Sequence, residues 1–170
     1  MVIWLIGLAG AGKTTIGREV VERLRRERPA VFLDGDDFRA IMGNDLGHSM
    51  EDRRTNAWRI CRLCEHLDKQ GVDVVCAILS LFHDTQDWNR EHYSQYFEVF
   101  VDAPMEILMA RDQKSLYSRA RAGQIHDVVG IDIDFVPPPL ADLVVTRADP
   151  AATPGELAHR IVEAAGKKFP

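Results

Sequence analysis

Residues 7–14 read GLAGAGKT and match the pattern G-x-x-x-x-G-K-[ST]. The apolar run 2–6 before them is typical of a buried strand, and an amphipathic helical pattern follows them. In this context the glycines let the backbone curl until its N–H groups face a phosphate, and the positive end of the following helix adds to the attraction. The segment therefore predicts a phosphate-binding loop, with Lys13 beside the β- and γ-phosphates of a nucleotide and the Thr14 hydroxyl as a Mg²⁺ ligand. The alternative is a glycine-rich turn with an incidental lysine.

Apolar, β-branched runs alternate with longer amphipathic runs along the rest of the chain, which indicates an α/β fold. The runs predicted as strands of a mostly parallel, buried sheet are 2–6, 31–34, 72–79, 97–102 and 142–146. The segments predicted as helices are 14–28, 51–70 and roughly 154–165. The interval 124–139 has little periodicity and ends in prolines, so it is interpreted as a functional loop. We expect a three-layer α/β/α fold of the P-loop NTPase type with a five-stranded sheet.

Length and composition predict one soluble globular domain over residues 1–170. Apolar residues make up 46% of the chain and charged residues 28%, and the formal net charge of −5 gives no indication of a nucleic-acid partner. No run is long enough to span a membrane. The cysteines are Cys61, Cys64 and Cys76, an odd number that predicts reduced thiols and a cytoplasmic location. Because Cys61 and Cys64 lie on the apolar stripe of a predicted helix, core packing is favoured over a metal or redox role.

An acidic segment, LDGDD at 33–37, ends the second predicted strand. Asp34 and Asp36 are two residues apart, so in an extended chain both side chains would project to the same side. Ligands of parallel α/β sheets bind beyond the carboxyl ends of the strands. One carboxylate is therefore expected to orient or deprotonate an attacking hydroxyl, and the other to hold Mg²⁺ through water. The alternative is a solvated acidic turn that caps the next helix.

The phosphate-binding loop does not by itself separate kinases from GTPases, motors or mere nucleotide-binding modules. The chain has no N-K-x-D guanine motif. The predicted strand 72–79 is followed by Ser80 rather than by the acidic residue of a Walker B strand, which weakens the motor and GTPase interpretations. A small kinase is the interpretation that remains.

Several blocks resemble adenylylsulfate kinases in their order and spacing, over nearly the whole chain. These blocks are GLAGAGKTT, LDGDDFR, DLGHSMEDRRTNAWRI, RDQKSLYSRARAGQI and VVGID. The resemblance implies ATP- and Mg²⁺-dependent phosphorylation of the ribose 3′-hydroxyl of a small nucleotide. It also implies a lid and acceptor segment at roughly 111–139, and a homodimer.

The resemblance also assigns roles to individual positions. The catalytic residues would be Lys13, Asp34 and Asp36. The ATP-binding residues would be Gly7, Gly10, Ala11, Gly12, Lys13, Thr14, Thr15 and Arg111. The acceptor-binding residues would be Asp36, Arg39, His48, Arg53, Asn56, Leu79, Ser80, Phe82, Lys114, Leu116 and Val128.

The chemistry of two groups of residues is consistent with this assignment. Arg53 and Asn56 are three apart near the start of a predicted helix, so they share one face and can address one anionic ligand; a solvated helix start is the alternative. A second basic cluster, expected to cover the phosphates and exclude water, consists of Arg111, Lys114, Arg119 and Arg121. Its alternative is an exposed charged helix face.

Departures from the family pattern lie on the acceptor side. His48 and Val128 replace the two phenylalanines that sandwich the acceptor's adenine in the family, and Val129 replaces a threonine. In the segment 80–83 the family motif S-P-[YF]-R becomes SLFH, and a further arginine is replaced by Gln86, whereas Arg90 is retained.

The phosphoryl-transfer residues thus match while the acceptor pocket differs, which leaves three hypotheses. The first is a family kinase that acts on a cytidine diphosphoramidate-type nucleotide in capsule or polysaccharide modification. The second is an ordinary adenylylsulfate kinase of sulfate assimilation. The third is a non-catalytic nucleotide-binding module, against which the complete lysine, hydroxyl and carboxylate set argues.

Overall fold

The computed structural model describes residues 1–112, 115–146 and 152–170. Within these residues, five strands form one sheet in the order β2-β3-β1-β4-β5, and each pairing is parallel. The strands are β1 (Val2–Ile6), β2 (Ala30–Asp34), β3 (Asp73–Ile78), β4 (Tyr96–Asp102) and β5 (Leu143–Thr146). The predicted five-stranded, mostly parallel sheet is confirmed.

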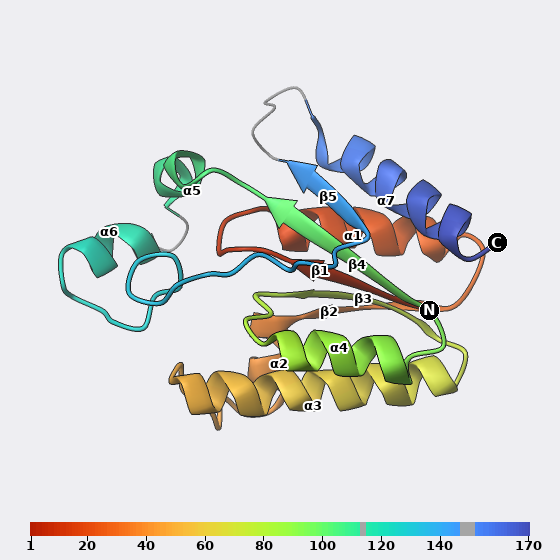
Figure 1. The fold of residues 1–170 in the computed structure, drawn as a ribbon, viewed down its shortest axis with the longest axis horizontal. Coiled ribbons are helices and arrows are strands. Elements are labelled where there is room, and N and C mark those ends of the chain that lie inside the picture. The colour runs from red at the N-terminus through yellow and green to blue at the C-terminus, as the bar shows by residue number, and fades with distance from the viewer. Residues whose placement is uncertain (113–114, 147–151) are drawn as a thin grey trace.

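Helices cover both faces of this sheet, with α1 and α7 on one side and α3 and α4 on the other (Figure 1). Beyond the carboxyl ends of the strands lie α5 and α6. The helices are α1 (Lys13–Leu24), α2 (Gly35–Ile41), α3 (Met50–Lys69), α4 (His83–His92), α5 (Met105–Arg111), α6 (Leu116–Arg121) and α7 (Pro154–Lys168). The three-layer α/β/α fold is therefore confirmed, and the helices α5 and α6 of the predicted lid region lie beyond the carboxyl ends of the strands.

Strand β1 shows why the strands read as continuous apolar runs. Ile3 and Leu5 face the core formed with α1 and α7, whereas Trp4 and its alternate neighbours face the core formed with α3. Since side chains alternate between the two faces of a strand, and helices cover both faces, every position of β1 must be apolar. Cys61, Cys64 and Cys76 are buried in the second core as free thiols, as predicted.

Two predicted helices have different ends in the structure. Helix α1 stops at Leu24 rather than at residue 28, and the N–H groups of Glu27 and Arg28 both donate to the Leu24 carbonyl. Pro29 prevents the helix from continuing beyond these turns, because Arg28, the residue before the proline, is disfavoured in helical conformation. Helix α7 continues past 165 to Lys168.

The segment 124–139 contains no helix or named strand, so its interpretation as a loop is confirmed. It runs from α6 across the carboxyl ends of the strands and back along the sheet toward β5 (Figure 1). Within 1–112, 115–146 and 152–170, no helix combines the length and apolar character that a membrane crossing requires.

Candidate active site

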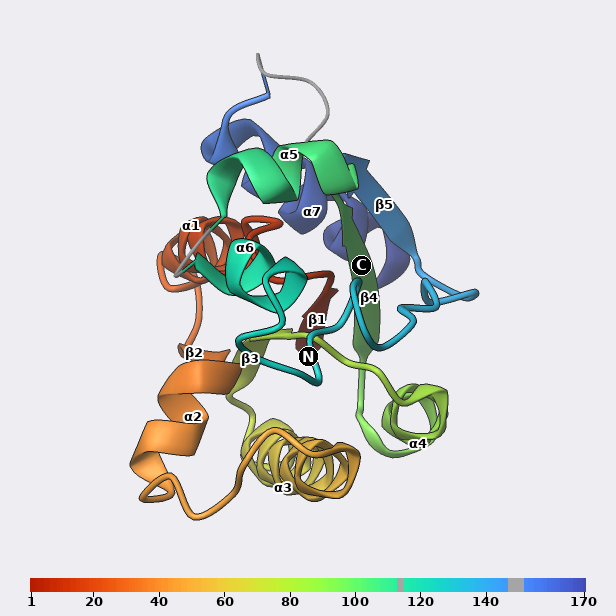
Figure 2. The same ribbon diagram turned by 90° about the vertical axis from the view of Figure 1, so that its left-hand side faces the viewer.

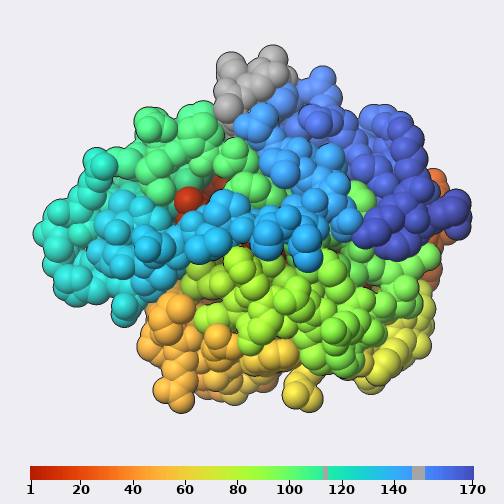
Figure 3. All heavy atoms as spheres, viewed as in Figure 1, coloured from red at the N-terminus to blue at the C-terminus, as the bar shows by residue number. Residues whose placement is uncertain are grey.

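The candidate site lies where β1, β2 and β3 end. Because β3 lies between β2 and β1 in the sheet, the loop 79–82 after β3 is flanked by the acidic end of β2 and by the loop 7–12 after β1. Figure 2 looks onto this side of the molecule, with α6 in front of the sheet. In Figure 3 the red atoms of the N-terminal part of the chain are visible at the bottom of a recess bordered by the green α5 and the cyan-to-blue loop.

The loop 7–12 leads directly from β1 into α1. Gly10 and Gly12 have φ angles of 80° and 97°, a left-handed backbone that glycine adopts without strain. Gly12 is also the residue that precedes the first turn of α1. Within the loop Ala11 is buried, and Thr15 is exposed in the first turn of α1. These positions agree with the predicted phosphate-binding loop.

Lys13 is half-buried, and its Nζ donates a hydrogen bond to the Leu8 carbonyl at 2.9 Å. Burial lowers the pKa of its ammonium group to about 8, against the opposite effects of Asp34 and Asp36. An anion beside this group would counteract the shift, because it favours the charged form. The side chain is thus a cation placed where phosphate binding would restore its full charge.

Asp34 connects the loop 7–12 to the acidic segment. Its Oδ2 accepts a hydrogen bond from the Thr14 hydroxyl at 2.6 Å, and its Oδ1 accepts from the backbone N–H of Asp36 at 2.9 Å. Asp34 therefore caps α2, and Asp36 lies in the first turn of that helix. The prediction that both residues project from an extended strand is wrong, because the strand ends at Asp34. Both carboxylates nevertheless lie close enough to Lys13 to raise its pKa.

The oxygen atoms of Thr14 and Asp34 fit a Mg²⁺ ion. A hydroxyl and a carboxylate 2.6 Å apart form a pair of hard oxygen donors, and Mg²⁺ is usually held by one or two protein oxygens together with substrate phosphates and water. Among the described residues there is no group of three or more His, Cys, Asp or Glu side chains suited to a metal ion. A protein-only metal cage is therefore not the arrangement that this site offers.

Arg39, His48 and Arg53 form a cluster near Asp36, since both arginines and Asp36 act on the pKa of His48. Arg53 donates from Nε to the His48 carbonyl at 2.7 Å and from Nη2 to the Asp127 carbonyl at 2.8 Å, so it ties the start of α3 to the loop 124–139. Arg39 donates to a carbonyl of the segment before α3. Burial, together with Arg39 and Arg53, lowers the pKa of His48 below its ordinary value, which keeps the imidazole neutral at pH 7.

Asn56 lies one helical turn after Arg53 and is 6% exposed. Its Oδ1 is buried and has no hydrogen-bond partner in the structure as described. A buried acceptor without a donor costs free energy, and such groups in native proteins are usually satisfied by a partner or by a ligand. The predicted pairing of Arg53 and Asn56 on one face therefore provides a cation and an open acceptor side by side.

Comparison with known proteins agrees with this geometry. The family model described as adenylylsulphate kinase matches residues 1–146. The chain belongs to the adenylylsulfate kinase family. It is an ATP-dependent kinase of that family, a phosphotransferase with a hydroxyl acceptor.

Relatives with two different names are similar to this member of the family. The cytidine diphosphoramidate kinase of Campylobacter jejuni is 38% identical over 148 residues, which cover 86% of each chain. The adenylyl-sulfate kinase of Gloeothece citriformis is 42% identical over 148 residues, covering 86% of this chain and 84% of the relative. The structure resembles that of the Mycobacterium tuberculosis APS kinase in complex with AMPPNP and APS, with a TM-score of 0.88, 32% identity and coverage of 97% and 96%.

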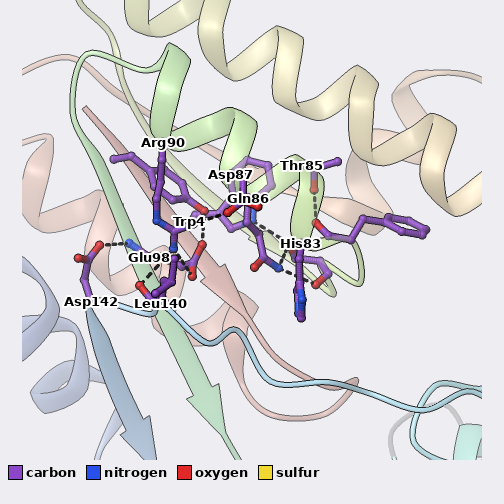
Figure 4. Close-up of polar contacts among 12 residues, drawn as sticks. Trp4, His83, Thr85, Gln86, Asp87, Arg90, Glu98, Leu140 and Asp142 are labelled. Carbon is purple, nitrogen blue, oxygen red and sulfur yellow. Dashed lines mark hydrogen bonds and ion pairs between the residues drawn. The ribbon is translucent and has the colours of Figure 1, made fainter.

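The loop 79–82 differs from the family pattern, and the structure places its side chains inward. Ser80 is 6% exposed with a left-handed φ of 52°, and its hydroxyl accepts from Trp4 Nε1 at 3.1 Å. Gln86, which replaces a family arginine, donates from Nε2 to the carbonyl and hydroxyl oxygens of Ser80 at 3.2 Å each (Figure 4). Phe82 is buried beneath the guanidinium of Arg54, 4.3 Å from the ring centroid. Gln86 therefore holds this loop instead of presenting a charge to a ligand.

Of the remaining predicted site residues that the structure describes, Leu79 follows β3, whereas Arg111, Leu116 and Val128 belong to the α5–α6 side. Leu79 and Leu116 are half-buried, and Val128 is buried in the core that contains Tyr117. Arg111 donates to the Gly10 carbonyl at 3.1 Å. Lys114 lies outside the described residues. The structure thus brings Arg111 to the nucleotide side, and it places Arg119 and Arg121 at exposed positions of α6.

Arg90, the arginine that the family pattern retains, is occupied in an ion pair. Its Nη2 lies 2.7 Å from Oε1 of Glu98, a fully buried side chain, and also donates to the Leu140 carbonyl at 3.1 Å (Figure 4). The other carboxylate oxygen of Glu98 accepts from the Tyr96 hydroxyl at 2.6 Å. Arg90 therefore neutralises a buried carboxylate instead of facing a ligand.

Replacing Arg90 with alanine is expected to lower the free energy of unfolding by about 2 kcal/mol, because it leaves Glu98 buried without its counter-charge. This loss of stability is smaller than the usual cost of breaking a buried ion pair. The Arg90 side chain is 27% exposed, so water can reach Glu98 once the arginine is removed. Urea unfolding measures this change. Lys69→Ala, which removes a surface pair with Glu65, is the control and should leave the free energy of unfolding nearly unchanged. An unchanged stability with a raised acceptor KM would instead make Arg90 an acceptor ligand.

Two residues near the site were not assigned from the sequence. In the sequence, Gln86 stands only at the position of a replaced arginine, and Tyr117 stands only within a block that resembles the family. Trp4 and Gln86 meet at Ser80, which lies 76 and 6 residues from them in the sequence. Spacing in the sequence carries no signal for such contacts.

Proposed function

We propose that this kinase transfers the γ-phosphate of ATP to the ribose 3′-hydroxyl of a cytidine diphosphoramidate-type nucleotide, in capsule or polysaccharide modification. The observation that carries the proposal is that His48 and Val128 stand where the family resemblance implies two aromatic platforms for an adenine acceptor, while the predicted phosphate-binding residues are present. The similarity to the Campylobacter jejuni cytidine diphosphoramidate kinase supports the same acceptor. The alternative is adenylylsulfate as acceptor, which is supported by the similarity to the named adenylyl-sulfate kinases.

We propose different roles for Asp34 and Asp36, according to the groups that lie beside each carboxylate. Asp34 lies beside Thr14, whose hydroxyl donates to its Oδ2, whereas Asp36 acts on the pKa of both Lys13 and His48 and so lies between the phosphate-binding loop and a predicted acceptor residue. We therefore assign proton acceptance from the ribose hydroxyl to Asp36, and Mg²⁺ positioning to Asp34 and Thr14. Lys13 neutralises charge on the transferred phosphoryl group, and Mg²⁺ would supply further charge neutralisation when bound.

Magnitudes favour the cytidine acceptor over adenylylsulfate. Stacking of a base on an aromatic side chain contributes about 1–3 kcal/mol per base, so losing both platforms would cost an adenine acceptor about 2–6 kcal/mol. Neutral His48 can offset part of this cost by stacking on one side. Val128 offers no surface on which the adenine base could stack, because its side chain is 4% exposed and buried in the core.

The anionic tail of the acceptor is affected in the same direction. Gln86 is neutral and turned toward Ser80, and Arg90 is paired with Glu98. Neither side chain offers a free guanidinium fork for a sulfate group. An acceptor with a less negatively charged tail would lose less binding free energy from the absence of free guanidinium groups.

Competition between the two acceptors in one reaction tests the proposal. We expect kcat/KM for cytidine diphosphoramidate to exceed that for adenylylsulfate at least about tenfold, a difference of about 1.4 kcal/mol in transition-state free energy. His48→Phe is the companion variant, because it restores one platform and should raise kcat/KM for adenylylsulfate more than for the cytidine acceptor. Preferential formation of 3′-phosphoadenylylsulfate would favour the alternative, and ATP binding without phosphorylation of either acceptor would favour a non-catalytic module.

We further propose that residues 1–170 act as one kinase domain, in the cytoplasm and as a homodimer. The buried free thiols of Cys61, Cys64 and Cys76 are consistent with a reducing compartment. The homodimer rests on the family resemblance. Sedimentation of the purified protein in the presence of ADP and Mg²⁺ measures the assembly state directly.

A further inference from the structure

Three successive carbonyls of the phosphate-binding loop each accept a hydrogen bond from a side chain. The Leu8 carbonyl accepts from Lys13 at 2.9 Å, within the loop itself. The Ala9 carbonyl accepts from the Tyr117 hydroxyl at 2.8 Å, and the Gly10 carbonyl from Arg111 at 3.1 Å. The last two donors come from α6 and α5, so these two helices hold the carbonyl oxygens of Ala9 and Gly10 in the phosphate-binding loop.

A bond to the Ala9 carbonyl also fixes the direction of an N–H group. The Ala9 carbonyl and the Gly10 N–H belong to the same planar trans peptide, in which they point in opposite directions. Gly10 has a φ of 80°, and glycine allows a neighbouring peptide to rotate at little steric cost. A donor that holds the Ala9 oxygen therefore keeps the Gly10 N–H pointing away from it, toward the side where a phosphate would bind.

Tyr117 is itself held in place. The residue is 1% exposed, and its ring packs in the core with Leu108 and Val128. The Asp112 carboxylate accepts hydrogen bonds from the backbone N–H groups of Tyr117 and Ser118 at 2.8 and 3.2 Å, which fixes the first turn of α6. Burial and the nearby Asp112 raise the pKa of Tyr117 to about 12, so the hydroxyl stays protonated and can donate.

We propose that Tyr117 is a positioning residue for the nucleotide: through its hydrogen bond to the Ala9 carbonyl it sets the orientation of the Ala9–Gly10 peptide and couples α6 to the phosphate-binding loop. It acts through the loop and does not itself touch the nucleotide. The inference rests on the proposed function, since it requires that this loop bind the phosphates of ATP.

Tyr117→Phe tests the inference, because it removes one oxygen and leaves the ring in the core. We expect the Kd for AMPPNP, measured by calorimetry, and the KM for ATP to rise about three- to tenfold, the usual range for one hydrogen bond. The acceptor KM should not change. Hydrogen–deuterium exchange of the peptide covering residues 7–13 should become faster in the variant.

Tyr93→Phe is the matched control. Tyr93 is also a buried tyrosine whose hydroxyl donates to a backbone carbonyl, that of Cys61 at 3.1 Å, but it lies near the start of β4, at the opposite end of the sheet from the site. This variant should keep the AMPPNP affinity of the unmodified protein. Equal AMPPNP affinities in all three proteins, or equal losses in both variants, would overturn the role of Tyr117. If the unmodified protein does not bind AMPPNP at all, the proposed function fails before Tyr117 is in question.

Discussion

Replacing Lys13 with alanine is expected to lower kcat by about 10²- to 10³-fold, because it removes one charge-stabilising donor from the transferred phosphoryl group. The fold should be retained, since alanine suits the first turn of α1. Folding lowers the pKa of Lys13 from 10.5 to about 8, so its charged form is less favourable in the folded than in the unfolded state. At pH 7 the variant should therefore be no less stable than the unmodified protein.

Steady-state kinetics with saturating ATP and acceptor, together with thermal unfolding, check this prediction. Lys167→Ala is the control, because Lys167 lies on α7 in an exposed pair with Glu163 and its loss should leave kcat unchanged. Near-normal turnover in Lys13→Ala would refute the assignment of the loop as the phosphate site.

Asp34→Asn and Asp36→Asn are each expected to lower kcat at least about 10²-fold with little change in ATP affinity. An asparagine at 34 still offers an oxygen to cap α2, so the fold should be kept. The two variants should differ in their response to Mg²⁺: raising its concentration should recover part of the activity of Asp34→Asn and none of that of Asp36→Asn.

Asp37→Asn provides the matched control for the carboxylates. Asp37 follows Asp36 directly, is exposed and lies 3.9 Å from Arg18, so its neutralisation should leave kcat unchanged. If both Asp34→Asn and Asp36→Asn unfold, or lose only ATP affinity, the acidic segment is a structural turn and not part of the catalytic machinery.

Several features of the protein follow from local sequence alone. The apolar runs fixed the strands to within a few residues, because a strand covered on both faces must be apolar at every position. The pattern GLAGAGKT placed a glycine-rich turn between β1 and α1, since its backbone requires left-handed conformations that glycine adopts without strain. Gly71 directly follows the last residues of α3, and its φ of 74° is the left-handed conformation with which helices commonly end.

The local geometry of the acidic segment was harder to predict. Alternation in an extended chain placed Asp34 and Asp36 on one side, but the chain leaves the strand at Asp34 and begins α2. Strand ends depend on where a neighbouring strand stops offering hydrogen bonds: Asp34 pairs with Ala77, and β3 ends one residue later. The residue at which β2 ends is therefore decided by its pairing in the sheet and not by the sequence of the segment 33–37 alone.

Only the tertiary structure determined which polar groups are available for ligands. Gln86 and Arg90 look alike in the sequence as polar residues of one helix, yet one holds Ser80 and the other neutralises Glu98 on β4. The Tyr117 hydroxyl reaches the Ala9 carbonyl, 108 residues away. Such contacts arise when the packed helices and sheet bring segments from different parts of the fold together, and the need to satisfy buried polar groups then selects the partners.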